Sequence, residues 1–117
     1  DHYKNSAEPA VAQILAEMSD WEEEPLLRHF APEAKQAITH EQLDHLLSIY
    51  RSFGRFRSIE ELEFSRTASA FSFFGEKRIN YSGIANFDAG PVNVNITLIE
   101  RNSFFFVYNF TLTRAVD

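Results

Sequence analysis

Residues 79–88 read INYSGIANFD, residues 91–100 read PVNVNITLIE, and residues 104–113 read FFFVYNFTLT. Each segment alternates large apolar residues with Asn, Ser or Thr, which is the period of two that a half-buried β-strand shows. The connections at residues 89–90 and 101–103 are short enough for tight turns. This stretch therefore predicts consecutive antiparallel strands, but it specifies no chemical reaction.

The part of the chain before these strands has helical spacing. A first helix is predicted from about Ser6 to Ser19, and residues 21–38 suit a bent helical pair. Thr39 and Gln42 match a capping box, which predicts the start of a further helix. Gly54 is a suitable residue to end that helix.

The spacing changes to a period of two over residues 58–74, which predicts one long strand with a turn at residues 75–77. Helices followed by strands indicate the α+β class. We therefore expect three N-terminal helices packed on a curved antiparallel sheet of four main strands. A length of 117 residues suits a single domain over residues 1–117.

Composition excludes several classes of function. The net charge of −6 disfavours nucleic acid as a partner and disfavours an anionic membrane surface. The chain has no cysteine, so disulfides, thiolate metal sites and cysteine nucleophiles are excluded. No apolar run is long enough to span a membrane, and no pair of histidines has the i, i+4 spacing together with the third ligand that a zinc site would need. We expect no metal, no cofactor and no membrane contact by this segment itself.

Three segments resemble a known superfamily: DWEEEPLLRHFAPEAKQAITHEQLDHLL (20–47), YRSFGRF (50–56) and YSGIANFDAGPVNVNITLIERNSFFFVYNF (81–110). They are similar to the nuclear transport factor 2-like superfamily, whose fold is a cystatin-like cone, and in particular to bacterial members of uncharacterised function. The resemblance implies the cone-shaped fold of ketosteroid isomerases and polyketide cyclases. Such domains often carry Trp near the start of the last strand, where this chain has residues 104–106, all Phe.

Alternation sorts the predicted strands into two faces. The more apolar face should meet the helices, either as a plain core or as the wall of a ligand cavity. The residues predicted to be core are Leu46, Leu47, Val94, Ile96, Phe106 and Phe110. Tyr81, Tyr108 and Arg66 are the candidate ligand-binding residues, and the ligand they suggest is small, flat and apolar. The inward strand positions include no Asp, Glu or His, so no catalytic residue is proposed and catalysis is disfavoured.

The opposite face is rich in Asn and Thr and nearly lacks long charged residues, which is typical of an interface. It predicts a homodimer through a patch with these members: Asn93, Asn95, Thr97, Phe105, Val107 and Asn109. A solvated polar face is the alternative.

These observations favour a non-enzymatic binding or protein-interaction domain. The resemblance, together with a chain that begins at Asp1, suggests the extracytoplasmic or periplasmic part of a bacterial envelope protein whose N-terminal signal or anchor has been removed. Two alternatives stay open. One is a small-molecule enzyme of the ketosteroid isomerase or polyketide cyclase kind, and the other is a structural dimerisation module.

Overall fold

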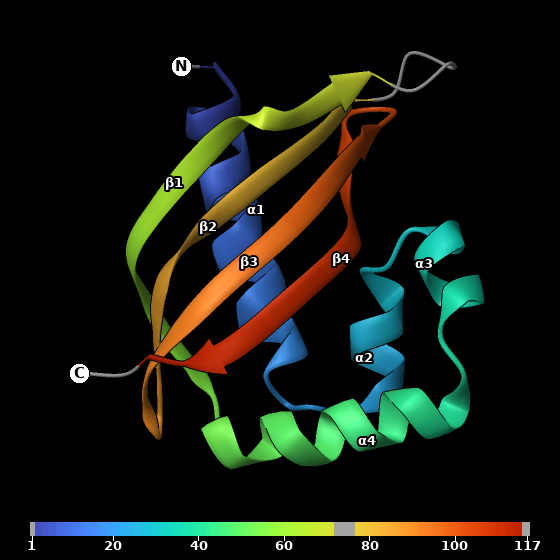
Figure 1. Cartoon of the computed structure of the whole chain (residues 1–117), viewed down its shortest axis with the longest axis vertical. Coiled ribbons are helices and arrows are strands. Elements are labelled where there is room, and N and C mark those ends of the chain that lie inside the picture. The colour runs from blue at the N-terminus through green and yellow to red at the C-terminus, as the bar shows by residue number, and fades with distance from the viewer. Residues whose placement is uncertain (1, 72–76, 116–117) are drawn as a thin grey trace.

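A computed structural model describes the main chain of residues 2–71 and 77–115 and the side chains of residues 8–63 and 78–115. Its sheet has four antiparallel strands in the order β1-β2-β3-β4 (Figure 1). The helices are α1 (His2–Met18), α2 (Glu23–Arg28), α3 (Pro32–Ala37), α4 (His40–Tyr50) and the short 3₁₀ helix η1 (Arg51–Phe53). The strands are β1 (Phe56–Phe71), β2 (Lys77–Phe87), β3 (Gly90–Arg101) and β4 (Phe104–Arg114).

This architecture confirms the α+β class and the four-stranded antiparallel sheet, but the number of helices was wrong. The described chain has four α-helices where three were expected, because the predicted bent pair is two separate helices. Pro32 stands at the first position of α3, where its missing N–H costs nothing, so a new helix begins there. The predicted turn at residues 75–77 lies largely outside the described residues.

The helices do not form one layer. Figure 1 shows α1 running behind the sheet, α2 and α3 beside β4, and α4 across one end of the strands. The face of the sheet against α1 is called here the helix-covered face, and the other is called the open face. The open face therefore has no helix over it in the described part of the chain.

The capping box predicted at the start of α4 is present. The backbone N–H of Gln42 donates to Thr39 Oγ1 at 3.1 Å, and the backbone N–H of Thr39 donates to Gln42 Oε1 at 2.9 Å. Two N–H groups that the helix itself cannot pair are thus satisfied. Gly54 follows η1 with φ of 79°, a conformation that glycine adopts without steric cost.

A continuous core fills the space between the helix-covered face and the helices. Trp21 has 2% of its surface exposed, its ring stacks on Phe87 at 6.1 Å, and it lies 5.3 Å from Tyr50. Its indole Nε1–H donates to the carbonyl of Gly54 at 2.8 Å. One side chain therefore joins the linker after α1 to α4 and to β2.

β1 pairs irregularly with β2. The pairing with β2 shifts register between Ile59 and Glu61, which leaves an extra residue on β1. At this point a Cβ on Gly83 would lie 1.9 Å from the Glu61 carbonyl oxygen. Gly83 is thus the residue that lets β1 approach β2 where the sheet bends.

A second irregularity, in β4, overturns part of the predicted face assignment. Thr97 pairs with Asn109 and Leu98 pairs with Val107, so Tyr108 is an extra residue in β4. The extra residue reverses the faces of the β4 side chains that precede it, residues 104–107, while Phe110 and Leu112 after it keep the predicted face. Val107 is 0% exposed and belongs to the core, contrary to its predicted place on the opposite face.

Contacts outside the sheet stabilise this arrangement. The Val107 N–H donates to the carbonyl of His29 at 2.7 Å, and the Ala31 N–H donates to the carbonyl of Val107 at 2.8 Å. The linker between α2 and α3 thereby pairs with β4 like a short parallel strand. Part of the β4 edge is covered, which protects main-chain groups that an edge strand would leave free.

Only some of the residues predicted to be core are buried. Leu47, Val94 and Ile96 are buried, as predicted. Leu46 and Phe110 are half-buried and pack against the core. The prediction for Phe106 was wrong, because Phe106 lies on the opposite side of β4 from Val107 and outside the core cluster.

Candidate functional site

Tyr81 and Tyr108, two of the residues predicted to bind a ligand, do not meet in one cavity. Tyr81 is 0% exposed within the core, whereas Tyr108 is half-buried at the β4 bulge, with the Arg78 guanidinium carbon 4.2 Å from its ring centroid. Arg78 and Tyr81 lie three positions apart on β2, so they point to opposite faces of the sheet. The sheet therefore separates the two phenols. Arg66 belongs to β1, but its side chain lies outside the described residues.

The predicted dimer surface is also divided. Phe105 is half-buried and packs against the core, and Val107 is buried in it, so neither side chain belongs to the open face. The other members follow the open-face alternation of β3 and its pairing with β4: Asn93, Asn95, Thr97 and Asn109. The polar part of the prediction and its apolar part thus lie on different sides of the sheet.

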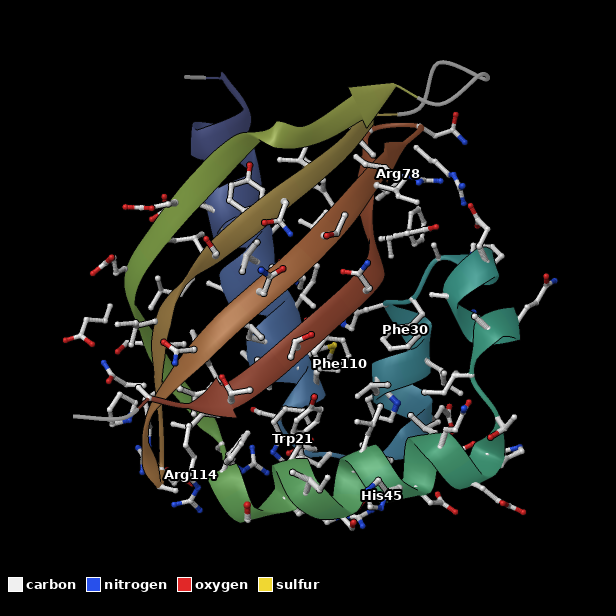
Figure 2. The ribbon with its side chains drawn as sticks, in the orientation of Figure 1. Trp21, Phe30, His45, Arg78, Phe110 and Arg114 are labelled. Carbon is white, nitrogen blue, oxygen red and sulfur yellow. The ribbon has the colours of Figure 1, made fainter. Side chains whose placement is uncertain are left out.

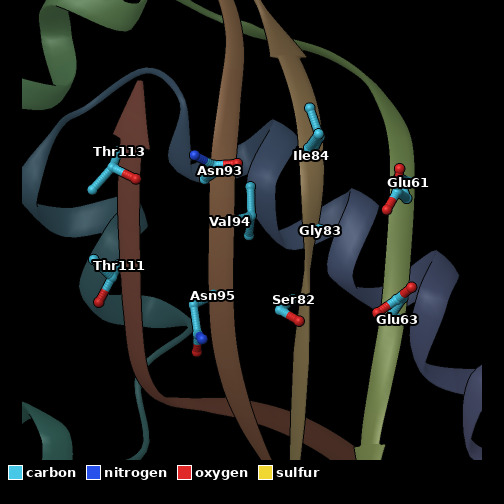
Figure 3. A pocket seen from close by; sticks show the side chains of 10 residues that line it. All are labelled: Glu61, Glu63, Ser82, Gly83, Ile84, Asn93, Val94, Asn95, Thr111 and Thr113. Atoms are coloured by element: carbon cyan, nitrogen blue, oxygen red, sulfur yellow. The ribbon is translucent and has the colours of Figure 1, made fainter. Parts of the chain in front are cut away.

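The open face carries a shallow depression of about 370 Å³ that crosses all four strands (Figure 3). Its centre is the pair Gly83 and Val94, where Gly83 has no side chain and Val94 is buried on the far side. The floor is therefore largely main chain. The side chains around it form two rows across the sheet, the first with Glu63, Ser82, Asn95 and Thr111 and the second with Glu61, Ile84, Asn93 and Thr113.

Short polar side chains on this face are already joined to one another. The Asn80 amide nitrogen donates to Asn95 Oδ1 at 2.8 Å and to Thr97 Oγ1 at 2.9 Å. The Asn86 amide nitrogen donates to Ser58 Oγ at 3.3 Å. These bonds hold several side chains in defined positions, so the face is ordered before any partner binds.

The charged side chains of the depression lie at one of its sides, on β1. Glu61 and Glu63 are exposed on β1, and the described residues that line the depression include no Lys or Arg. Thr111 and Thr113 stand at the other end of the rows, on β4. One side of the depression thus offers carboxylate acceptors and the other offers hydroxyl donors.

A second hollow of about 470 Å³ lies between α3, α4 and β4. Most of its wall is apolar, formed by Phe30, Ala34, Ile38, Leu46 and Phe110. Polar groups are few and stand among these apolar residues: Gln42, His45, Tyr108 and Asn109. Tyr108 is thus the predicted ligand residue that reaches a pocket, although the pocket is not inside a cone.

A third hollow, of about 340 Å³, borders α1, the end of α2 and the start of β4. His29 lines it, with its Nε2 2.7 Å from Glu17 Oε1. Hydrogen bonds from Gln13 first, and then from His29, lower the pKa of the Glu17 carboxyl. The arrangement is a histidine oriented by a carboxylate beside a hollow.

An ion pair connects α3 to the end of β3. Arg101 donates two hydrogen bonds to the Glu33 carboxylate, one of them from Nη1 to Oε1 at 2.9 Å. These bonds, a backbone hydrogen bond and the charge of Arg78 lower the pKa of Glu33 to about 2. The pair links α3 to the sheet at the top of the apolar hollow.

Two further classes of site have no counterpart among the described residues. No group of three or more His, Asp or Glu side chains there is placed to hold a metal ion. In the same part of the chain no helix combines the length and the apolar character that crossing a membrane requires.

The wall of the apolar hollow was not predicted from the sequence. Ala34 and Ala37 lie three residues apart on α3, and Ile38, four residues after Ala34, directly follows the helix. This spacing could have indicated an apolar helix face. No local signal shows that β4 lies opposite this face. That contact depends on the β4 bulge and on the pairing with residues 29–31.

The chain was compared with models of protein families, with curated proteins and with solved structures, and none of the three comparisons found a match.

Proposed function

We propose that this chain is a non-enzymatic interaction domain that pairs with a second copy of itself through the open face. The observation that carries the proposal is the depression that crosses the four strands. Short polar residues line most of it, Glu61 and Glu63 lie at its β1 side, and the described lining residues include no Lys or Arg. Depletion of long charged residues is characteristic of the centre of an interface. A two-fold homodimer is also the commonest symmetric assembly.

The two rows of side chains suggest how the copies pair. If the two-fold axis runs parallel to the strands, each row lies over the same row of the other copy in reverse order. Glu63 would then meet Thr111 of the other copy, and Ser82 would meet Asn95. Carboxylates would accept hydrogen bonds from hydroxyl groups. Such hydrogen bonds are strong because the acceptor is charged.

An axis across the strands is disfavoured by charge. It would bring β1 over β1 of the other copy, with the carboxylates of Glu61 and Glu63 near their own equivalents. Like charges facing one another in an interface cost several kcal/mol. The proposal therefore specifies one orientation of the dimer.

Sedimentation equilibrium tests self-association. We expect the wild-type chain to form a dimer at high micromolar concentration, and a monomer there would refute the proposal. Asn95→Arg puts a long cation in the middle of the face and should dissociate the dimer. Gln36→Arg, the same charge change on exposed α3, should leave it intact.

A second variant tests the orientation. Thr111→Lys should preserve the dimer or strengthen it at low salt, because the new cation would lie opposite Glu63 of the other copy. A dimer that Thr111→Lys weakens as much as Asn95→Arg would exclude an axis parallel to the strands while leaving self-association in place.

The nuclear transport factor 2-like fold is part of the same proposal. Its support is the resemblance of the three segments and the general agreement with an α+β chain that has one four-stranded antiparallel sheet. An experimental structure that includes residues 72–76 would test it. A cone closed around a cavity on the helix-covered face would support the assignment, and a flat sheet would oppose it.

A small-molecule enzyme is the second candidate, and the pair of His29 and Glu17 is the observation that favours it. A histidine held by a carboxylate beside a hollow can act as a general base. The reaction of that kind is proton abstraction next to a carbonyl group. Exchange of such protons in 2-tetralone dissolved in deuterated water, compared with the His29→Gln variant, would detect it.

A further inference from the structure

The apolar hollow between α3, α4 and β4 shares no lining residue with the depression on the open face, and the proposed self-association leaves it without an occupant. Its volume of about 470 Å³ falls within the range of roughly 300–1,000 Å³ that small-molecule pockets occupy. Its wall is mostly apolar with a few polar groups, which is also the composition of such pockets.

The hollow exists because α3 cannot fill it. No residue of α3 is buried, and the side chains that α3 presents to the hollow are the small Ala34 and Ala37. Two attachments nevertheless hold α3 beside β4: the ion pair of Glu33 with Arg101, and the pairing of residues 29–31 with Val107. The space is therefore built into the fold and does not collapse onto the alanines.

The opposite wall is aromatic. Phe30 and Phe110 contact one another edge to face, with centroids 5.9 Å apart and planes at 70° (Figure 2). Phe110 also lies 5.6 Å from Tyr50, which is buried in the core. A wall of aromatic rings facing a wall of alanines makes a slot, and a planar ring system fits a slot with the most contact area.

The polar groups of the slot are two side-chain amides, a phenol and the imidazole of His45. Gln42, Tyr108 and Asn109 offer hydrogen bonds, while the described residues that line the slot include no Lys, Arg, Asp or Glu. A ligand with a full charge would lose hydration without gaining an ionic partner there. An uncharged ligand with one hydroxyl or carbonyl group would keep its hydrogen bond.

We infer that this slot binds a flat, uncharged aromatic molecule of about two fused rings that carries one hydrogen-bonding oxygen. The rings lie between the alanines of α3 and the aromatic wall. The oxygen lies at the polar residues of α4 and β4, among which Gln42 and His45 are exposed on α4.

The probe is 2-naphthol. Its binding is measured by calorimetry and by the changes in amide chemical shifts. We expect saturable binding at one site, with the largest shifts at Ala34, Leu46 and Asn109 and none at Ser82. 1-Decanol has the same number of carbons and one hydroxyl but is not flat, so it should bind at least about tenfold more weakly. No saturable binding of 2-naphthol, equal affinity for 1-decanol, or shifts centred elsewhere would overturn the inference.

Two variants localise the site. Ala37→Phe fills the slot from α3 and should abolish binding, while Ala16→Phe makes the same change on the exposed surface of α1 and should not. His45→Leu keeps the apolar wall and removes a hydrogen-bonding partner, so it should weaken binding about threefold to tenfold. His45 is exposed, so this variant should fold even if Ala37→Phe does not. Unchanged affinity in either pocket variant would overturn the inference.

Discussion

The two faces of the sheet arise from one alternation of side chains along the strands, but their surroundings differ. On the helix-covered face, Tyr81, Val92 and Ile96 are at most 1% exposed and lie in one core with α1. On the open face, the same strands present Asn80, Asn93 and other short polar groups over a shallow depression. Strand β2 and strand β3 thus contribute both to stability and to a surface that is free to bind.

The comparison indicates where substitutions should act. Apolar burial dominates folding stability, so changes on the helix-covered face should alter the free energy of unfolding. Changes on the open face should alter association and leave the folded chain nearly intact. At the bulge at Tyr108, the alternation of β4 side chains between the two faces changes phase. Substitutions on either side of β4 near this bulge therefore test the comparison most directly.

The largest expected effect is that of Val107→Lys. Val107 is 0% exposed, and an ammonium group there would be desolvated without a partner. We expect the free energy of unfolding to fall by about 3–5 kcal/mol, as for other uncompensated buried charges. Phe106→Lys, one residue earlier on the opposite side of β4, should cost less than about 1.5 kcal/mol. Urea denaturation of both variants gives the two values, and equal losses would mean that β4 does not exchange faces at Tyr108.

This exchange could not be predicted from the sequence, and the reason lies in the composition of β4. Residues 104–108 are Phe, Phe, Phe, Val and Tyr, so both possible phases of the alternation are apolar. The choice is made by non-local hydrogen bonds, those of Val107 with His29 and Ala31. Where only one phase is apolar, as in residues 92–98 of β3, the predicted face and the observed face agree at Val94 and Ile96.

The second prediction concerns the bend of the sheet at Gly83. A methyl group there would lie 1.9 Å from the Glu61 carbonyl oxygen, a contact that only a shift of the main chain can relieve. We expect Gly83→Ala to lower the free energy of unfolding by about 3 kcal/mol, at the upper end of overpacking effects. Gly90→Ala is the control, because nothing lies within 4 Å of its Cβ and its cost comes from a φ of 128° alone. A loss for Gly83→Ala below that of Gly90→Ala would remove the argument that close approach requires glycine.

The helical half was easier to predict than the sites. The capping box of Thr39 with Gln42 is a local pattern, and the structure contains both of its hydrogen bonds. The apolar slot instead requires that α3, α4 and β4 come together, which no window of sequence encodes. Tyr108 reaches that slot through the bulge, while the alternation alone grouped it with Tyr81.

The third prediction addresses the open face. The Asn80 side chain donates to Asn95 and to Thr97, so Asn80→Ala removes two hydrogen bonds. We expect a loss of about 1 kcal/mol in the free energy of unfolding of the monomer, because the site is only part-buried. Asn93→Ala changes an exposed asparagine on the same face and should cost less than about 0.5 kcal/mol. Thermal unfolding at low protein concentration separates these values, and a loss near that of Val107→Lys would contradict the division between the faces.

The smallest effect should come from the ion pair that lies outside both faces. Arg101 and a backbone hydrogen bond lower the pKa of Glu33 to about 2 from its ordinary value of 4.5. A folded-state pKa below the unfolded value means that the pair stabilises the fold above about pH 4.5, and that this contribution is lost as the pH falls toward 2. Because 45% of the Glu33 side chain is exposed, solvent screening limits the contribution to about 1 kcal/mol or less.

Glu33→Gln should therefore destabilise the chain slightly at pH 7, and its difference from the wild type should shrink as the pH is lowered from about 5 to about 3. Glu60→Gln, an exposed carboxyl on β1 outside this ion pair, should change the free energy of unfolding by less than about 0.5 kcal/mol at pH 7. Urea denaturation at several pH values measures both. A difference for Glu33→Gln that stays constant with pH would assign its effect to altered packing of α3, and the ion pair would then not be what holds α3 beside β4. Because the aromatic slot depends on that position of α3, the same variant should also bind 2-naphthol more weakly if the pair fixes the wall of the slot.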